Sequence, residues 1–182
     1  ADPACRGFLD RVGGAGVHVT IWDITSDVGV AAYGCALMED PREPAWRSLG
    51  LYQGFGCHLS PPVALLRALT EAAQTRLTYI AGSRDDFFPA DYARATDQAL
   101  LRDIWADVTS PAVARGGEAV DFAAARDLAG ATFEDDVRTL LERLASAGSG
   151  SAIAVELSRP ALGVPVVKIL VPGRATRVDL MG

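Results

Sequence analysis

Residues 54–86, GFGCHLSPPVALLRALTEAAQTRLTYIAGSRDD, decide the fold around them, because they predict one long helix with glycines before and after it. Successive residues of an α-helix turn by roughly 100°, so polar residues spaced four, three and four apart fall on one face. These residues are Arg67, Glu71, Gln74 and Thr78. The other faces are apolar almost all round, which is typical of a buried helix. We therefore expect the chemistry on this polar face.

Burying a guanidinium, a carboxylate and an amide is costly unless they pair with one another, with a metal or with a ligand. One interpretation is an ion pair between Arg67 and Glu71, four residues apart, that closes on itself. The other is a polyanion bound with a divalent cation. In that case Glu71 and Gln74 supply hard oxygen ligands, and Arg84, just after the helix, faces phosphate. Spacing alone does not decide between them.

Three stretches of the chain, in order, resemble the YcaO family: WDITSDVGV at 22–30, the run from His58 to Asp86, and VPVVKILVPG at 164–173. The resemblance covers most of the chain. It implies an enzyme that uses ATP and Mg²⁺ to activate a backbone amide oxygen of a peptide. A Cys, Ser or Thr side chain or an external sulfide then attacks the amide carbon. The products in the family are azolines, macroamidines or thioamides.

Residue by residue, the resemblance implies that Glu71 and Gln74 belong to the second nucleotide-and-magnesium motif of the family and are the metal ligands. The same segment adds His58 and Arg67 as cofactor-binding candidates, and Arg84 as a phosphate contact. The first motif of the family, a helix with Ser, three residues, Glu, two residues and Glu-Arg, does not occur in this sequence. The resemblance identifies no catalytic residue.

The family domain is much longer than this chain, which begins at Ala1 without an initiator methionine. We therefore expect residues 1–182 to be a single domain, the C-terminal part of a YcaO domain, that does not complete an ATP site alone. Azoline-forming members end in a proline-rich tail, whereas this chain ends in GRATRVDLMG. The difference favours the branch that performs thioamidation with a TfuA-like partner protein. Family members are often dimers, so a homodimer is compatible with the resemblance.

Composition predicts a cytoplasmic globular protein, with 49% hydrophobic residues, 22% charged residues and a net charge of −6. Such a charge offers no basic surface for nucleic acid, and no apolar run reaches the roughly 18 residues that cross a bilayer. Three scattered cysteines without metal-binding spacing indicate reduced thiols. Cys57 beside His58 is either a nucleophile with its base or a small residue packed under a loop. Neighbours in extended backbone point to opposite faces, which argues against direct pairing.

The remaining pattern predicts an α+β fold. Residues 17–24 and 29–38 are expected to form an N-terminal β-hairpin, and 151–157 and 164–171 a C-terminal one. We expect these hairpins to build a mixed or antiparallel sheet with helices between them, as half of a YcaO-type ATP-binding domain. Further expected elements are helices at 3–12, 89–108 and 132–145, a loop at 40–54 and a flexible segment at 109–118.

Two functions follow from this sequence. The first is an incomplete portion of an ATP- and Mg²⁺-dependent enzyme that activates a peptide backbone amide for thioamide or azoline formation. The alternative is a non-catalytic YcaO-like scaffold that binds a peptide or a partner protein. The presence of Glu71 and Gln74 at the expected positions favours the enzyme, because a decayed site would be free to replace a costly carboxylate.

Overall fold

The computed structural model of the chain describes residues 2–82, 88–110 and 119–173. The chain divides into two compact units, one built from residues 1–25 and 31–127 and the other from residues 26–30 and 128–182. The prediction that residues 1–182 form a single domain is not tested by this division and stays a prediction.

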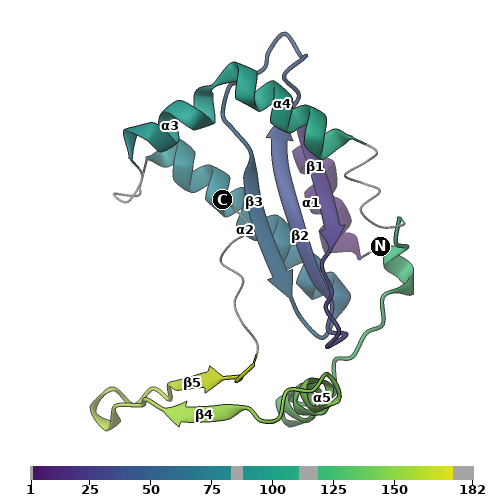
Figure 1. Cartoon of the computed structure of the whole chain (residues 1–182), viewed down its shortest axis with the longest axis vertical. Helices are drawn as coiled ribbons and strands as arrows, with labels where there is room; N and C mark the ends of the chain where they lie inside the picture. Colours follow the sequence, from purple (N-terminus) through teal and green to yellow (C-terminus); the bar gives the residue numbers. More distant parts are fainter. Residues whose placement is uncertain (1, 83–87, 111–118, 174–182) are drawn as a thin grey trace. The chain divides into compact units, whose positions relative to one another are not determined.

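The first unit contains most of the helices and strands (Figure 1). Its elements are α1 (Pro3–Gly14), β1 (Val17–Asp23), β2 (Ala32–Glu39), β3 (Tyr52–Cys57), α2 (Pro61–Ala81), α3 (Pro89–Thr96), α4 (Gln98–Thr109) and the 3₁₀ turn η1 (Phe122–Ala124). The second unit contains α5 (Phe133–Ser146), β4 (Ile153–Glu156), the 3₁₀ turn η2 (Pro160–Leu162) and β5 (Val167–Leu170).

The first unit is organised around an antiparallel sheet in the order β1-β2-β3. Ile21 lies opposite Cys35, and Gly34 lies opposite Phe55. Because successive side chains of a strand point to opposite faces, the odd-numbered and even-numbered residues of β2 face different partners. Helix α2 packs on one face of the sheet and α4 on the other, so β2 is buried from Tyr33 onward.

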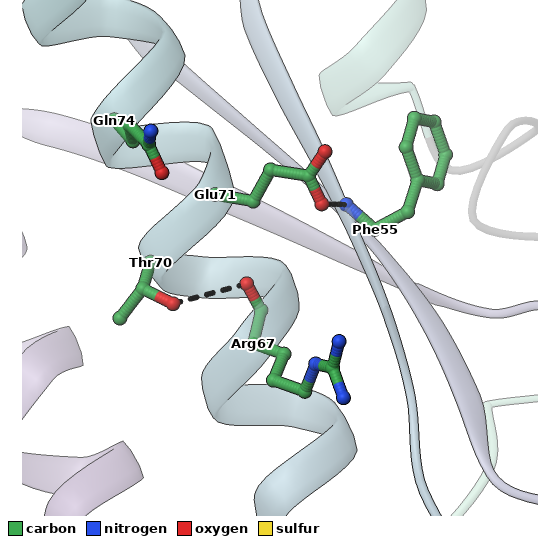
Figure 2. Close-up of a pocket in the computed structure, with 5 residues that line it drawn as sticks. All are labelled: Phe55, Arg67, Thr70, Glu71 and Gln74. Atoms are coloured by element: carbon green, nitrogen blue, oxygen red, sulfur yellow. Dashed lines mark hydrogen bonds between the residues drawn. The ribbon is translucent and has the colours of Figure 1, made fainter. Parts of the chain in front are cut away.

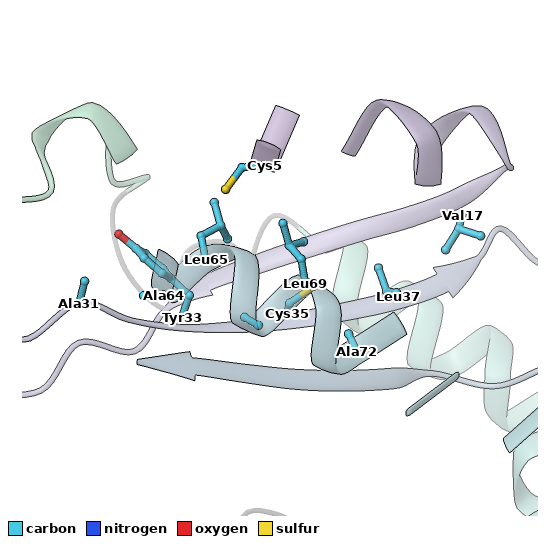
Figure 3. Close-up of a cluster of buried hydrophobic side chains, with 11 residues drawn as sticks. Cys5, Val17, Ala31, Tyr33, Cys35, Leu37, Ala64, Leu65, Leu69 and Ala72 are labelled. Atoms are coloured by element: carbon cyan, nitrogen blue, oxygen red, sulfur yellow. The ribbon is translucent and has the colours of Figure 1, made fainter. Parts of the chain in front are cut away.

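The larger core lies between α2 and the sheet (Figure 3). It contains Cys5, Val17, Ala31, Tyr33, Cys35, Leu37, Ala64, Leu65, Ala68, Leu69 and Ala72. On the opposite face of the sheet, Met38 of β2 packs against Leu101 and Trp105 of α4. The larger cluster holds α2 on one face of the central strand, and the smaller cluster holds α4 on the other face.

Strand β3 is the main element that the sequence did not predict, because residues 40–54 were expected to be a loop. Gly54 and Gly56 obscure the strand pattern, since glycine is depleted in strands. Their role is steric. A Cβ atom on Gly56 would lie 2.6 Å from the Ala68 nitrogen, and one on Gly54 would lie 2.9 Å from the Glu71 carbonyl carbon. Only glycine lets the backbones of β3 and α2 approach this closely.

Helix α2 confirms the predicted long helix, but its polar face is not buried. The helix begins with prolines in its first turn and ends at Gly82, whose φ of 60° is in the left-handed region favoured by glycine. Arg67, Glu71 and Gln74 are exposed. The expectation of an all-round buried helix was wrong, because its small alanines serve the close contact with β3 and its C-terminal leucine and isoleucine are exposed.

The expected helix at 89–108 is two helices. The side chain of Asp97 accepts hydrogen bonds from the backbone nitrogens of Ala99 and Leu100, so Asp97 begins α4 and interrupts the run. In the second unit, the Thr132 side chain accepts a hydrogen bond from the Asp135 nitrogen and caps the start of α5, which confirms the helix expected from residue 132.

The antiparallel α+β fold is confirmed, but the two hairpins do not share a sheet. Strands β4 and β5 form a separate two-stranded sheet in the second unit. Of the segment expected to be flexible, residues 111–118 lie outside the described residues. Within the described part of the chain, no helix combines the length and the hydropathy needed to span a membrane.

Candidate functional site

An open pocket of about 310 Å³ lies where the polar face of α2 meets the free edge of β3 (Figure 2). Its lining residues are Phe55 of β3 and Arg67, Thr70, Glu71 and Gln74 of α2. The four helical residues follow the spacing of one helix face. The structure therefore brings together three of the predicted site residues on a surface that solvent reaches.

Glu71 is held by the backbone of β3. Its Oε2 atom accepts a hydrogen bond of 3.0 Å from the Phe55 nitrogen. No ion pair joins the described side chains of Arg67 and Glu71, so the interpretation of a pair that closes on itself is wrong. The carboxylate turns instead toward an N–H group on the side of β3 where the described part of the chain places no further strand. Arg67 is left as an exposed cation in the same pocket.

Two lining residues were not predicted as site residues. The hydroxyl of Thr70 donates to the carbonyl oxygens of Leu66 and Arg67, so it is satisfied by its own helix. Phe55 is half exposed and contributes both its ring and its backbone N–H. An aromatic residue between two glycines was the available signal, but its meaning depended on recognising β3. Thr78, on the predicted polar face, is not among the lining residues.

His58 lies outside the lining of this pocket. Its Nδ1 atom accepts a hydrogen bond of 2.9 Å from the Ser60 nitrogen. Ser60 in turn donates from its hydroxyl to Asp127 at 2.8 Å. His58 therefore helps to shape the turn into α2. The prediction that it binds cofactor stays a prediction, and Arg84 lies outside the described residues.

Cys57 is exposed at the end of β3. Although the residue is exposed, partial desolvation of its sulfur raises the pKa of the Cys57 thiol, and the nearby Arg67 charge opposes this only in part. A reactive thiol needs a lowered pKa. This environment favours the interpretation of Cys57 as an ordinary thiol over that of a nucleophile paired with His58.

An ion cluster around the buried Glu39 carboxylate anchors α2 beyond the pocket. Glu39, the last residue of β2, accepts bonds from Arg76 of α2 and, at 2.7 Å, from the Arg47 guanidinium. Burial alone would raise the pKa of Glu39, but the hydrogen bonds from Arg47 and the charges of both arginines hold it below its usual value. Arg76 is two residues beyond Gln74, so the cluster fixes α2 next to the pocket.

The donor set of the pocket fits a magnesium ion that shares its coordination with a ligand. Glu71 and Gln74 offer a carboxylate and an amide oxygen, and Arg67 offers a cation for phosphate. Among the described residues no group of three or more His, Cys, Asp or Glu side chains could hold a metal by itself. Magnesium is commonly bound through one or two carboxylates, with waters and substrate phosphates completing its shell.

The family model described as YcaO cyclodehydratase, ATP- and Mg²⁺-binding, matches residues 1–175. This chain belongs to the YcaO family. An uncharacterized protein from the tfuA 3′ region of Rhizobium leguminosarum bv. trifolii is 34% identical over 191 residues, covering 100% of this chain and 43% of the relative. An uncharacterized protein of Methanothermobacter thermautotrophicus is 34% identical over 172 residues, covering 92% of this chain and 42% of the relative.

Solved structures show the same fold. A heterocyclase in complex with substrate and cofactor has a TM-score of 0.70 and 25% identity, over 94% of this chain and 22% of that one. YcaO from Methanopyrus kandleri, bound with AMPPCP and Mg²⁺, has a TM-score of 0.63 and 24% identity, over 94% of this chain and 43% of that one. This YcaO chain thus spans less than half the length of the curated relatives it matches.

Proposed function

We propose that this chain is part of an enzyme that uses ATP and Mg²⁺ to activate a backbone amide of a peptide or protein substrate. In that reaction the amide oxygen takes the terminal phosphoryl group of ATP, and ADP is released. A nucleophile then adds to the amide carbon and loses a proton, and the former amide oxygen leaves with phosphate. The observation that carries the proposal is the convergence of Glu71, Gln74 and Arg67 on one open pocket.

Each of these side chains has a distinct proposed role. Glu71 and Gln74 hold Mg²⁺ through oxygen atoms, and the ion would offset the charge of the phosphates. Arg67 contacts phosphate, since its guanidinium is exposed in the pocket and has no acidic partner within ion-pair distance among the described residues. The family description, which includes ATP and Mg²⁺ binding, supports these roles. His58 and Arg84 stay candidates for the same site.

The proposed product is a thioamide formed with the help of a TfuA-like partner. The relative from the tfuA 3′ region supports this choice. A test is to incubate the full-length gene product with peptide, MgATP and sulfide, with and without the partner. The mass of the peptide is then measured by mass spectrometry. Exchange of oxygen for sulfur supports a thioamide, whereas loss of water without sulfur incorporation indicates an azoline.

The assignment of the pocket is tested by calorimetry with Mg²⁺ and a non-hydrolysable ATP analogue. The chain and the full-length gene product are compared, each with Glu71 intact and as Glu71→Ala. We expect the full-length protein to bind and Glu71→Ala to abolish both binding and ATP turnover. Turnover unchanged by Glu71→Ala would contradict the proposal. If neither the unsubstituted chain nor the unsubstituted full-length protein binds the ATP analogue, the result would favour the alternative, a scaffold that binds a peptide or partner without using ATP.

A further inference from the structure

Strand β3 presents one backbone group to the pocket. In an antiparallel ladder, alternate residues of a strand direct their N–H and C=O groups away from the neighbouring strand. Phe55 is such a residue, because its N–H reaches the Glu71 carboxylate instead of β2 (Figure 2). This N–H is therefore available to bind a side chain from α2.

The bond restricts a side chain that would otherwise be mobile. Glu71 is exposed, and a free glutamate loses substantial rotamer entropy when a ligand orders it. One carboxylate oxygen, Oε2, is bound to the Phe55 nitrogen at 3.0 Å. A carboxylate accepts several bonds through its two oxygens, so Oε1 can still bind a ligand in the pocket. The backbone bond thus fixes the orientation of Glu71 in advance.

The glycines on either side of Phe55 make the geometry of this bond possible. Gly54 and Gly56 allow the backbone of β3 to lie directly against α2, and Phe55 is between them. With a longer separation, a glutamate side chain on α2 would not be aligned with the outward N–H of residue 55. The same close packing that buries the apolar face of α2 therefore aligns its polar face with the strand edge.

We infer that the backbone N–H of Phe55 is a positioning group for Glu71, and that it prepares this carboxylate to bind magnesium with a nucleotide. The inference rests on the proposed function of the pocket. Loss of a group that orients a metal ligand typically weakens metal affinity by roughly 10- to 100-fold. We expect a loss of that size when the N–H is removed.

Proline at position 55 removes the N–H without removing a ladder bond, because this N–H faces away from β2 and proline is tolerated on edge strands. Phe55→Ala removes the ring and keeps the N–H, so it is the reference for Phe55→Pro. Gln53→Pro is the matched control, since residue 53 is two positions earlier on the same edge. Each variant is made in the full-length gene product, and its thermal unfolding is compared with that of the unsubstituted protein.

Affinity for Mg²⁺ with the non-hydrolysable ATP analogue is then measured at increasing Mg²⁺ concentrations. We expect Phe55→Pro to bind roughly 10- to 100-fold more weakly than Phe55→Ala, with part of the loss recovered at high Mg²⁺. Gln53→Pro should bind as the unsubstituted protein does. Equal affinities of Phe55→Pro and Phe55→Ala would overturn the inference.

Amide hydrogen exchange provides a second measurement that needs no proline. In the absence of nucleotide, Glu71→Ala should speed exchange at the Phe55 amide and leave its ladder-bonded neighbours Gly54 and Gly56 unchanged. Unchanged exchange at Phe55 would overturn the inference even if the proline variant does not fold. A different result would separate the inference from the proposed function. If the unsubstituted protein bound no nucleotide but exchange at the Phe55 amide still depended on Glu71, the proposed function would be overturned and the bond between Phe55 and Glu71 would be retained.

Discussion

Replacing Gly56 with alanine should separate helix α2 from the sheet. The added Cβ would lie 2.6 Å from the Ala68 nitrogen and 2.9 Å from the Arg67 Cβ, and closer still to the Ala64 carbonyl oxygen. Favourable contacts between heavy atoms need about 3.5 Å or more, so the helix has to retreat by more than about 1 Å. Two of the three obstructing atoms are backbone, which cannot rotate away.

The expected cost is at the upper end of the range for overpacking, about 3 kcal/mol. For a protein of this size such a loss lowers the melting temperature by roughly 10 °C. The measurement is thermal and urea unfolding of the purified protein, followed by circular dichroism. Displacement of α2 should also lengthen the bond from Phe55 to Glu71 and so speed exchange of the Phe55 amide.

Gly34→Ala is the matched control. Gly34 lies opposite Phe55 on the central strand, but a Cβ there would lie 3.5 Å from the nearest atom, on the Phe55 ring. That is an ordinary contact, and alanine is not strained in a strand. We expect a change in stability within about 1 kcal/mol. If Gly56→Ala were as stable as Gly34→Ala, the argument that β3 and α2 need glycine between them would be refuted.

Three other predictions concern stability. Arg76→Met removes one partner of buried Glu39, and because Arg47 remains, we expect the free energy of unfolding measured in urea to fall by about 2 kcal/mol, less than the full cost of breaking a buried pair. An unchanged free energy of unfolding would show that Arg47 alone satisfies the carboxylate. Burial raises the pKa of the Cys35 thiol from 9.0 to about 12, so the neutral thiol stabilises the fold fully below pH 9 and this contribution is lost as the pH rises toward 12. Between pH 9 and pH 12 the free energy of unfolding of the unsubstituted protein should therefore fall by up to about 4 kcal/mol more than that of Cys35→Ala, and parallel profiles of unfolding free energy against pH would contradict the assignment. Gly7→Ala should raise the free energy of unfolding by about 0.5 to 1 kcal/mol, because Gly7 is inside α1 and a Cβ there meets no atom within 4 Å; a lower melting temperature would contradict this.

The sequence was sufficient for features that depend on residues close together in the chain. The spacing of Arg67, Glu71 and Gln74 predicted one polar helix face, and the glycine after the helix predicted its end at Gly82. The threonine at position 132 predicted the start of α5. Each of these features follows from helix periodicity or from a local hydrogen bond, so no distant residue is needed to decide it.

The sequence was not sufficient where a distant backbone changes the meaning of a residue. Gly54 and Gly56 weakened the strand pattern of β3, although they are there because α2 packs against them. Asp97 divided an apparently continuous helix by capping the second part. The sequence placed Arg67 and Glu71 at ion-pair spacing, yet it contained no sign that a strand edge would compete for the carboxylate.

The sequence by itself thus determined the family, the long helix and the side chains that meet on its polar face, since all of these are carried by order and spacing along the chain. Only the tertiary structure decided that this face is exposed, that Phe55 belongs to the pocket and that Glu71 is bound by the edge of β3. The physical reason is that burial and hydrogen-bond partners depend on which elements pack together. Here that packing is set by the close approach of α2 to β3, which no local pattern encodes.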